Sequence, residues 1–128
     1  MLIDHINIIA PGEIIDRVSN FYCDVFGFNV GFRPDFNSKG YWLYSDDKPQ
    51  IHLTINDSLS QNNNTGFLDH VAFSVTGLSQ FVSKLRKCNI DYQSHYVSEI
   101  QTTQIFFQDP SGLRLEASFK NEKLEKPY

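Results

Sequence analysis

The stretch LDHVAFSV at residues 68–75 has a near copy, IDHINIIA, at residues 3–10. Each places an Asp-His pair directly before a run in which every second residue is apolar, which is typical of a half-buried β-strand. The two copies lie 65 positions apart. The chain is therefore predicted to contain an internal duplication of a module that begins with a strand.

The elements expected after the first copy are one helix and three strands. Pro11-Gly12 ends the strand expected over residues 3–9, and Gly27 is predicted to cap the C-terminus of the following helix. Apolar residues at spacings of three and four form the stripe of that helix: Ile14, Ile15, Val18, Phe21, Tyr22, Val25 and Phe26. Strands are then expected over residues 28–32, 40–44 and 50–55.

The same order is expected after the second copy. Thr76 is predicted to cap a helix with the stripe Leu78, Phe81, Val82 and Leu85. Strands follow over residues 91–96, 102–107 and 113–119, and QDPSG before the last one predicts a tight turn with proline at its second position. The predicted fold class is α+β, with two tandem βαβββ modules that can close around a shared cavity when they lie side by side.

The bulk composition predicts one globular domain. Hydrophobic residues make up 41% of the 128 residues, which is enough for a packed core. We expect a single domain over residues 1–120, with modules at about 3–56 and 67–119, a polar linker at 56–66 and a loosely held charged tail at 120–128.

The charge and the absence of targeting signals argue against nucleic acid and membranes as partners and favour a cytoplasmic location. A net charge of −4 and scattered basic residues give no field that would hold nucleic acid. The sequence has no apolar run of about 20 residues for a membrane span and no secretion signal. The two cysteines form no CxxC motif, so we expect a cytoplasmic protein with reduced thiols.

Four residues of metal-binding type occur at matched places in the two halves. His5 and His70 lie on the expected first strands, 65 positions apart, and His52 and Glu116 lie on the expected last strands, 64 apart. Strand alternation puts each of them opposite an apolar face that should pack under a helix. All four are therefore predicted to point away from the helices, toward a cavity where they bind one metal ion.

These features together resemble the vicinal oxygen chelate superfamily, also called the glyoxalase/bleomycin resistance/dioxygenase family. The motifs that carry the resemblance are DHINI, FYCDVFGF, YWLY, QIHL, DHVAFSV and FFQDPSGLRLEAS. The resemblance implies that the βαβββ modules pair into an open eight-stranded mixed sheet or barrel around a divalent metal, with ligands at His5, His52, His70 and Glu116. It also implies a homodimer with shared active sites. In many short members the paired modules come from different chains, and the sequence leaves open whether the modules pair within one chain or between two.

The resemblance leaves the reaction open. Glyoxalases of this length have glutamate where this chain has His52, and an arginine that binds glutathione where this chain has Ile9. Asn56 matches an asparagine that glyoxalases use to hold glutathione. The subset His5, His70 and Glu116 resembles the ligands of extradiol dioxygenases and of fosfomycin-modifying thiol transferases.

The donor set suits zinc, nickel, cobalt or ferrous iron. The expected activity is that of a glyoxalase-like lyase or isomerase, in which a vicinal-oxygen substrate chelates the metal and a proton moves through an enediolate. Glu116 is the expected catalytic proton shuttle, and glutathione or another thiol is the expected co-substrate. The alternatives are a dioxygenase or thiol transferase on the same scaffold, and a metal-free drug-binding protein like the bleomycin-binding members.

Further residues are expected around a small-molecule substrate. Arg33 and Arg114 are candidates for binding an anionic group, and aromatic walls are expected from the central strands, although strand alternation does not settle which aromatic residues face the cavity. The predicted substrate-binding residues are Asn7, Arg33, Trp42, Thr54, Asn56, Phe106 and Arg114.

Overall fold

The computed structural model describes residues 1–60 and 66–125. The chain divides into two compact units, Met1–Asn63 and Asn64–Tyr128, each described by itself. The division lies within the predicted linker, although residues 61–65 of that linker and 126–128 of the predicted tail lie outside the described residues.

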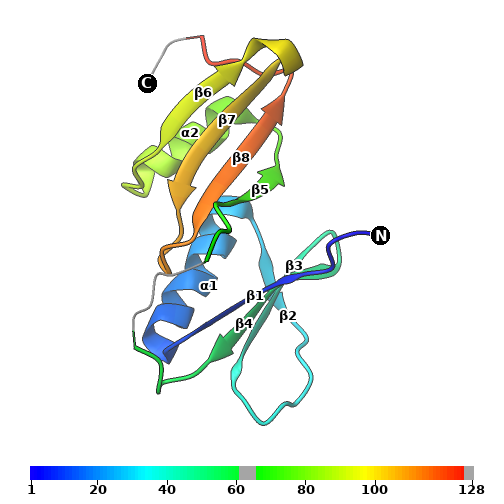
Figure 1. Ribbon diagram of the computed structural model, residues 1–128, viewed down its shortest axis with the longest axis vertical. Helices are drawn as coiled ribbons and strands as arrows, with labels where there is room; N and C mark the ends of the chain where they lie inside the picture. The colour runs from blue at the N-terminus through cyan, green and yellow to red at the C-terminus, as the bar shows by residue number, and fades with distance from the viewer. Residues whose placement is uncertain (61–65, 126–128) are drawn as a thin grey trace. The chain divides into compact units, whose positions relative to one another are not determined.

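The first unit contains one helix and one four-stranded mixed sheet (Figure 1). Its elements are β1 (Ile6–Ala10), α1 (Gly12–Phe26), β2 (Asn29–Gly31), β3 (Gly40–Ser45) and β4 (Lys48–Ile55). The strand order is β1-β4-β3-β2, with β1 parallel to β4 and the other neighbours antiparallel. The first and last strands of the module therefore lie side by side.

The second unit repeats this arrangement. Its elements are β5 (Val71–Ser74), α2 (Leu78–Lys87), β6 (Gln93–Val97), the 3₁₀ turn η1 (Ser98–Ile100), β7 (Thr102–Gln108) and β8 (Arg114–Lys120). The strand order is β5-β8-β7-β6, again with one parallel pair, β5 with β8. The prediction of an α+β fold made of two βαβββ modules is thus confirmed.

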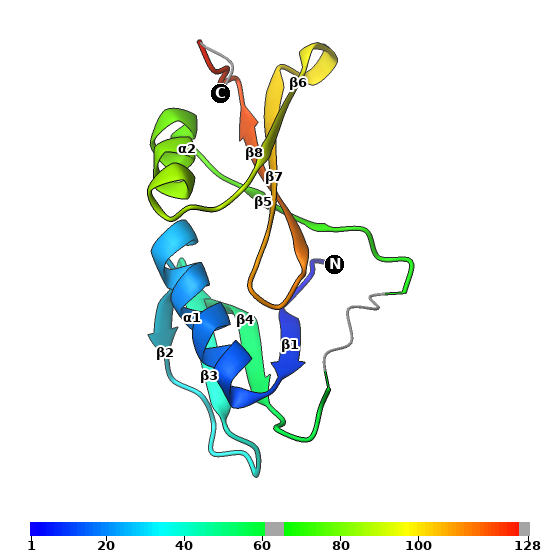
Figure 2. The same ribbon diagram turned by 90° about the vertical axis from the view of Figure 1, so that its left-hand side faces the viewer.

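In each unit the helix covers one face of its sheet (Figure 2). Val18 and Tyr22 of α1 are fully buried, as are Ile51 and Leu53 of β4. In the second unit, Phe81 of α2 contacts the rings of Phe107 and Phe119 at centroid distances of 5.7 and 5.4 Å. The apolar stripes read from the sequence thus form the two cores, and the other face of each sheet is left for polar side chains.

Both first strands begin later than predicted. The ladder between β1 and β4 starts at Ile6 opposite Ile51, and the ladder between β5 and β8 starts at Val71 opposite Leu115. The prediction that His5 and His70 lie within these strands was therefore wrong by one residue. Apolar alternation reports which side chains face the core, and it does not report where backbone pairing starts.

The predicted helix cap at Thr76 was also wrong. Gly77 is the N-cap residue, with φ of 87°. The Glu122 carboxylate accepts hydrogen bonds from the backbone N–H groups of Gly77 and Leu78, at 3.1 and 2.9 Å. A residue 45 positions away thus satisfies donors that a local hydroxyl was expected to satisfy.

Asn121 and Glu122, at the start of the predicted loose tail, are held by hydrogen bonds. The Asn121 N–H donates to the Gln101 carbonyl at 2.7 Å, and the Thr103 hydroxyl donates to the Glu122 carbonyl at 2.6 Å. The first unit has the matching feature, because the Gly12 N–H at the start of α1 donates to Asp57 at 2.8 Å. Asp57 and Glu122 are 65 positions apart, so the duplication includes this carboxylate.

No helix in residues 1–60 or 66–125 is both long enough and apolar enough to span a membrane.

Candidate metal site

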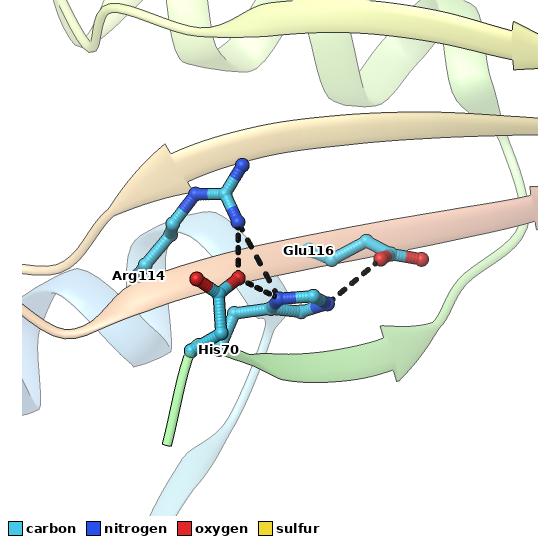
Figure 3. A network of polar contacts seen from close by, with 4 residues as sticks. His70, Arg114 and Glu116 are labelled. Atoms are coloured by element: carbon cyan, nitrogen blue, oxygen red, sulfur yellow. Dashed lines mark hydrogen bonds and ion pairs between the residues drawn. The ribbon is translucent and has the colours of Figure 1, made fainter. Parts of the chain in front are cut away.

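The second unit brings His70 and Glu116 together. Ala72 of β5 pairs with Glu116 of β8, and His70 lies two residues before Ala72, on the same face. His70 Nε2 lies 3.1 Å from Glu116 Oε1 (Figure 3). Glu116 is 7% exposed, so this carboxylate is held near an imidazole in a largely water-excluded position.

Asp69 and Arg114 extend this pair into a network of polar contacts, in which Figure 3 labels Arg114 beside His70. Asp69 Oδ2 lies 2.6 Å from His70 Nδ1 and 2.6 Å from Arg114 Nη1. The hydrogen bond with His70 is the largest effect on the pKa of Asp69 and lowers it; desolvation opposes this effect, and the positive charge of Arg114 adds to the lowering. Asp69 therefore remains a carboxylate that accepts from both neighbours.

The first unit places His5 and His52 in the matching positions. Asn7 of β1 pairs with His52 of β4, and His5 lies two residues before Asn7. Asp4 Oδ2 lies 2.7 Å from His5 Nδ1, as Asp69 does from His70. The His5 and His52 rings stack, with centroids 3.7 Å apart and planes inclined by 11°.

Trp42 lies against His52 from the other neighbouring strand. Its ring stacks on His52 at 4.0 Å, and Trp42 pairs with His52 between β3 and β4. Because β4 lies between β1 and β3, the His52 ring is held between His5 and Trp42. Burial, followed by the charge of His5, lowers the pKa of His52. The ring is therefore neutral at neutral pH, the form that binds metals.

The donor chemistry of these residues fits a divalent metal. His52 Nε2 is buried and has no hydrogen-bond partner, so its lone pair or proton is unused within the unit. The 3.1 Å between His70 Nε2 and Glu116 Oε1 can be bridged by one ion with bonds of about 2.1 Å. His5 and His52, in contrast, cannot both point at one ion while stacked, because imidazole lone pairs lie in the ring plane. One of these two rings must turn to share an ion with the other.

The structure thus gives two pairs, one in each unit. Within residues 1–60 and 66–125, no group of three or more His, Cys, Asp or Glu side chains is placed to hold a metal ion. The convergence of His5, His52, His70 and Glu116 on one ion stays a prediction.

The structure separates the aromatic residues whose direction strand alternation left open. Phe106 pairs with Glu116 and meets the His70 ring edge-on at 5.6 Å, as Trp42 pairs with His52 in the first unit. Phe107 instead contacts Phe81 of α2, and the Tyr41 hydroxyl donates to Asp16 of α1 at 2.8 Å. Trp42 and Phe106 therefore line the face that carries the candidate ligands.

Other predicted substrate-binding residues have partners within their own unit. The Thr54 hydroxyl donates to Asn7 at 3.0 Å. Asn56 Oδ1 accepts from the Ser58 N–H at 3.0 Å, which closes a local turn. Arg33 donates to the Ser38 carbonyl and hydroxyl at 2.9 and 3.2 Å and lies over the Phe36 ring. Arg33 and Asn56 are therefore occupied in local loop structure.

Asp4 and Asp69 were missed as candidate site residues, although the signal is in the duplicated stretch itself. Each precedes its histidine directly in both copies of the Asp-His pair. The histidines were recognised because they can bind a metal directly. The preceding carboxylates contact the histidine rings instead, so a search for direct ligands does not find them.

Each βαβββ module carries one pair of candidate ligands: His5 and His52 form the first half-site, and His70 and Glu116 form the second. Comparison with known sequences gives the family of proteins to which this arrangement belongs. Residues 2–117 match the Glyoxalase/Bleomycin resistance protein/Dioxygenase superfamily. The chain belongs to this superfamily, as its resemblance in sequence predicted. Members of the superfamily are mostly metal-dependent enzymes.

Individual relatives agree with this assignment. Glyoxylase I 4 of Arabidopsis thaliana is 31% identical over 121 residues, covering 89% of this chain and 68% of that protein. A glyoxalase family protein from Bacillus anthracis has a similar fold, with a TM-score of 0.74, 21% identity and coverage of 94% of this chain and 95% of that chain. A variant of the fosfomycin resistance protein FosX from Listeria monocytogenes, complexed with Mn(II) and a dihydroxypropylphosphonic acid, has a TM-score of 0.65, 16% identity and coverage of 98% and 97%.

Proposed function

We propose that this protein is a metal-dependent enzyme of the glyoxalase type, a lyase or isomerase acting on a small substrate with oxygens on adjacent carbons. The observation that carries the proposal is the His70–Glu116 pair, whose donor atoms lie 3.1 Å apart, with His70 directly before β5 and Glu116 on the neighbouring strand β8. His5 and His52 would complete the donor set. A divalent zinc, nickel, cobalt or ferrous ion held there would supply Lewis-acid stabilisation of negative charge on substrate oxygen.

Glu116 is the proposed catalytic residue. Its carboxylate is 7% exposed and lies opposite Phe106 in the sheet, so little water can exchange with a proton that it takes from the substrate. In an isomerisation it would take a proton from the carbon beside one oxygen and return it to the neighbouring carbon, which leaves Glu116 unchanged. Trp42 and Phe106 would form apolar walls around the substrate, and Asn7 and Thr54 would offer polar contacts on the ligand-bearing face.

Two positions that bind glutathione in glyoxalases differ here in residue type or in bonding. Ile9, at the position of the glutathione-binding arginine of glyoxalases, is 48% exposed. Asn56, at the position of the glutathione-holding asparagine, already bonds to Ser58. Both observations favour a small thiol other than glutathione as co-substrate, and Arg114, with Nη1 3.4 Å from His70 Nδ1, offers a cation at the proposed site.

We propose further that the enzyme is a cytoplasmic homodimer in which the modules of different chains pair. The support is the resemblance to short superfamily members and the division of the chain into two compact units, each with half of the donor set. Cys23 and Cys88 are both free thiols, which suits a reducing compartment.

Metal content tests the proposal most directly. Purified protein should contain, or take up, about one divalent ion per pair of modules, measured by elemental analysis and by titration with nickel or zinc. His52→Ala and Glu116→Ala should weaken uptake, whereas His95→Ala, which removes an exposed histidine on β6, should not. Metal-loaded protein should then convert methylglyoxal in the presence of a thiol. Parent protein that takes up no metal would instead favour the metal-free drug-binding class.

A second candidate is a fosfomycin-type enzyme that opens an epoxide. The specific observation is that His70 and Glu116 lie beside Arg114, a cation suited to an anionic substrate group, with Arg114 Nη1 3.4 Å from His70 Nδ1. FosX, with the same fold, is complexed with Mn(II) and a phosphonic acid. Loss of fosfomycin on incubation with the manganese-loaded protein, with and without a thiol, separates this candidate from the first.

A further inference from the structure

We propose that Asp69, anchored by Arg114, is a positioning residue that fixes the His70 ring with Nε2 facing Glu116. The inference rests on the proposed function and deepens it, because the ring is positioned for the metal that His70 and Glu116 are proposed to bind. Asp4 has the same relation to His5 in the first module.

The contacts of His70 divide the roles of its two ring nitrogens. Two carboxylates face the ring, Asp69 at Nδ1 and Glu116 at Nε2, at 2.6 and 3.1 Å. An imidazole that binds a metal through one nitrogen has one N–H left, and a carboxylate can accept from it. A metal ion bound between Nε2 and Glu116 would therefore leave the ring proton on Nδ1, where Asp69 would accept it in a short charge-assisted hydrogen bond.

Arg114 keeps the Asp69 side chain in the position from which it contacts His70. The Asp69 side chain is 72% exposed, so it would otherwise sample several rotamers. Arg114 Nη1 lies 2.6 Å from the same Oδ2 that contacts His70, and the guanidinium lies over the Phe106 ring at 4.4 Å. An exposed ion pair adds little to folding stability. The contribution we infer is therefore one of orientation.

The first module provides an internal comparison. Asp4 Oδ2 lies 2.7 Å from His5 Nδ1, but the Asp4 side chain is 90% exposed. The residue that corresponds to Arg114 is Gln50, two positions before His52 as Arg114 is two before Glu116. A neutral amide cannot anchor the carboxylate as a guanidinium does, so Asp4 should matter less than Asp69.

The test is Co²⁺ binding to the full chain, followed by titration calorimetry and by visible absorption of the bound ion. Asp69→Ala should weaken Co²⁺ binding about 10–100-fold, and Asp69→Asn, which keeps an acceptor oxygen, should lose less. Asp4→Ala should have a smaller effect. Glu99→Gln, which removes one negative charge from η1, is the matched control and should bind as the parent does.

Substitution of Arg114 distinguishes an effect through the position of Asp69 from a direct effect of the Arg114 charge on metal binding. Removing a cation beside a metal should by itself tighten metal binding, because like charges repel. If Arg114 acts through Asp69, Arg114→Gln weakens Co²⁺ binding in the parent and does not weaken it in the Asp69→Ala background. The His70 Nδ1 proton, which solvent exchange should remove faster in Asp69→Ala, gives an independent NMR readout on zinc-loaded protein.

The outcomes distinguish this inference from the proposed function. A parent protein that binds no Co²⁺ overturns both. If the parent binds Co²⁺ and His70→Ala abolishes the site, but Asp69→Ala binds as tightly as the parent, then Asp69 has no positioning role and the metal site stands. Equal weakening by Arg114→Gln in both backgrounds would show that Arg114 does not act through Asp69.

Discussion

At the scale of single residues, the two halves of the candidate site differ in how their side chains are held. Glu116 and His70 share a polar network with Asp69 and Arg114, whereas His52 is held between two rings and keeps a buried Nε2 without a hydrogen-bond partner. A buried polar atom of this kind costs stability unless a partner is supplied. A metal ion that binds to the first half-site should therefore contact His52 Nε2 directly.

Trp42 offers a reporter for that event. It is the single tryptophan of the chain and stacks on His52 at 4.0 Å. Co²⁺ or Ni²⁺ bound at His52 should quench Trp42 fluorescence in a saturable manner, because an open-shell ion close to an indole gives its excited state a rapid route of decay. Zn²⁺, which has a filled d shell, should compete with the quencher and cause little quenching itself.

Variants give this prediction its controls. His52→Ala should remove the saturable phase, and His95→Ala should keep it. Quenching that persists unchanged in His52→Ala would show that the ion binds elsewhere.

The two free cysteines should differ in reactivity. Burial, followed by the charge of Asp24, raises the pKa of the Cys23 thiol, while Cys88 is exposed after α2. A raised pKa reduces the thiolate fraction at pH 8, so iodoacetamide should modify Cys23 several-fold more slowly than Cys88. Peptide mass spectrometry over a time course measures both rates. Equal rates would contradict the assignment.

At the scale of secondary-structure elements, each module joins its last strand to its helix through one carboxylate. The first and last strands are parallel neighbours, so the chain that leaves the last strand passes the N-terminus of the helix that follows the first. Asp57 uses this position to accept from Gly12, and Glu122 uses it to accept from Gly77 and Leu78. Negative charge is favourable at a helix N-terminus, and these contacts also satisfy unpaired N–H groups.

Loss of either carboxylate should lower stability and leave metal binding unchanged. Glu122→Ala and Asp57→Ala should each cost about 1 kcal/mol of unfolding free energy, measured by urea denaturation. Glu122→Ala should cost more, because Glu122 accepts two backbone hydrogen bonds and Asp57 accepts one. Glu99→Ala and Asp35→Ala, at exposed positions, are the controls. A change below about 0.3 kcal/mol for both caps would show that the contacts are not kept in solution.

At the scale of the whole molecule, the duplication divides one proposed metal site between two units. Neither unit brings three donors of the proposed set together, and each contributes two. The proposed four-ligand site would therefore need one copy of each module, from the same chain or from two chains.

Complementation between inactive variants tests the proposed pairing between chains. His52→Ala damages the first module and Glu116→Ala the second, so in a mixed dimer one site receives both defects and the other receives none. Mixing equal amounts with subunit exchange should restore about a quarter of the parental metal sites, since about half of the dimers are mixed. Modules that pair within one chain would give no restoration, because every site then carries a defect.

The sequence alone predicted more of the fold than of the site. The apolar stripes of the helices and the alternation of the strands placed the core correctly, because burial depends on residue type at fixed spacing. The duplication then predicted the order of elements in both halves and two pairs of residues, His5 with His52 and His70 with Glu116, which lie together in the structure while their binding of one metal stays a prediction. Strand starts, the Thr76 cap and the loose hold on Asn121 and Glu122 were wrong, because each depends on contacts with residues far away in the chain.

The amino-acid sequence by itself determined two βαβββ modules and the superfamily, since local periodicity and short motifs are enough for both. Only the tertiary structure decided which aromatic residues face the ligands, that Asp69 and Arg114 hold His70, and that distant carboxylates cap the helices. The physical reason is that strand alternation fixes a side chain's face relative to its own backbone. Its hydrogen-bond partner is set by the register between strands, which no single strand encodes.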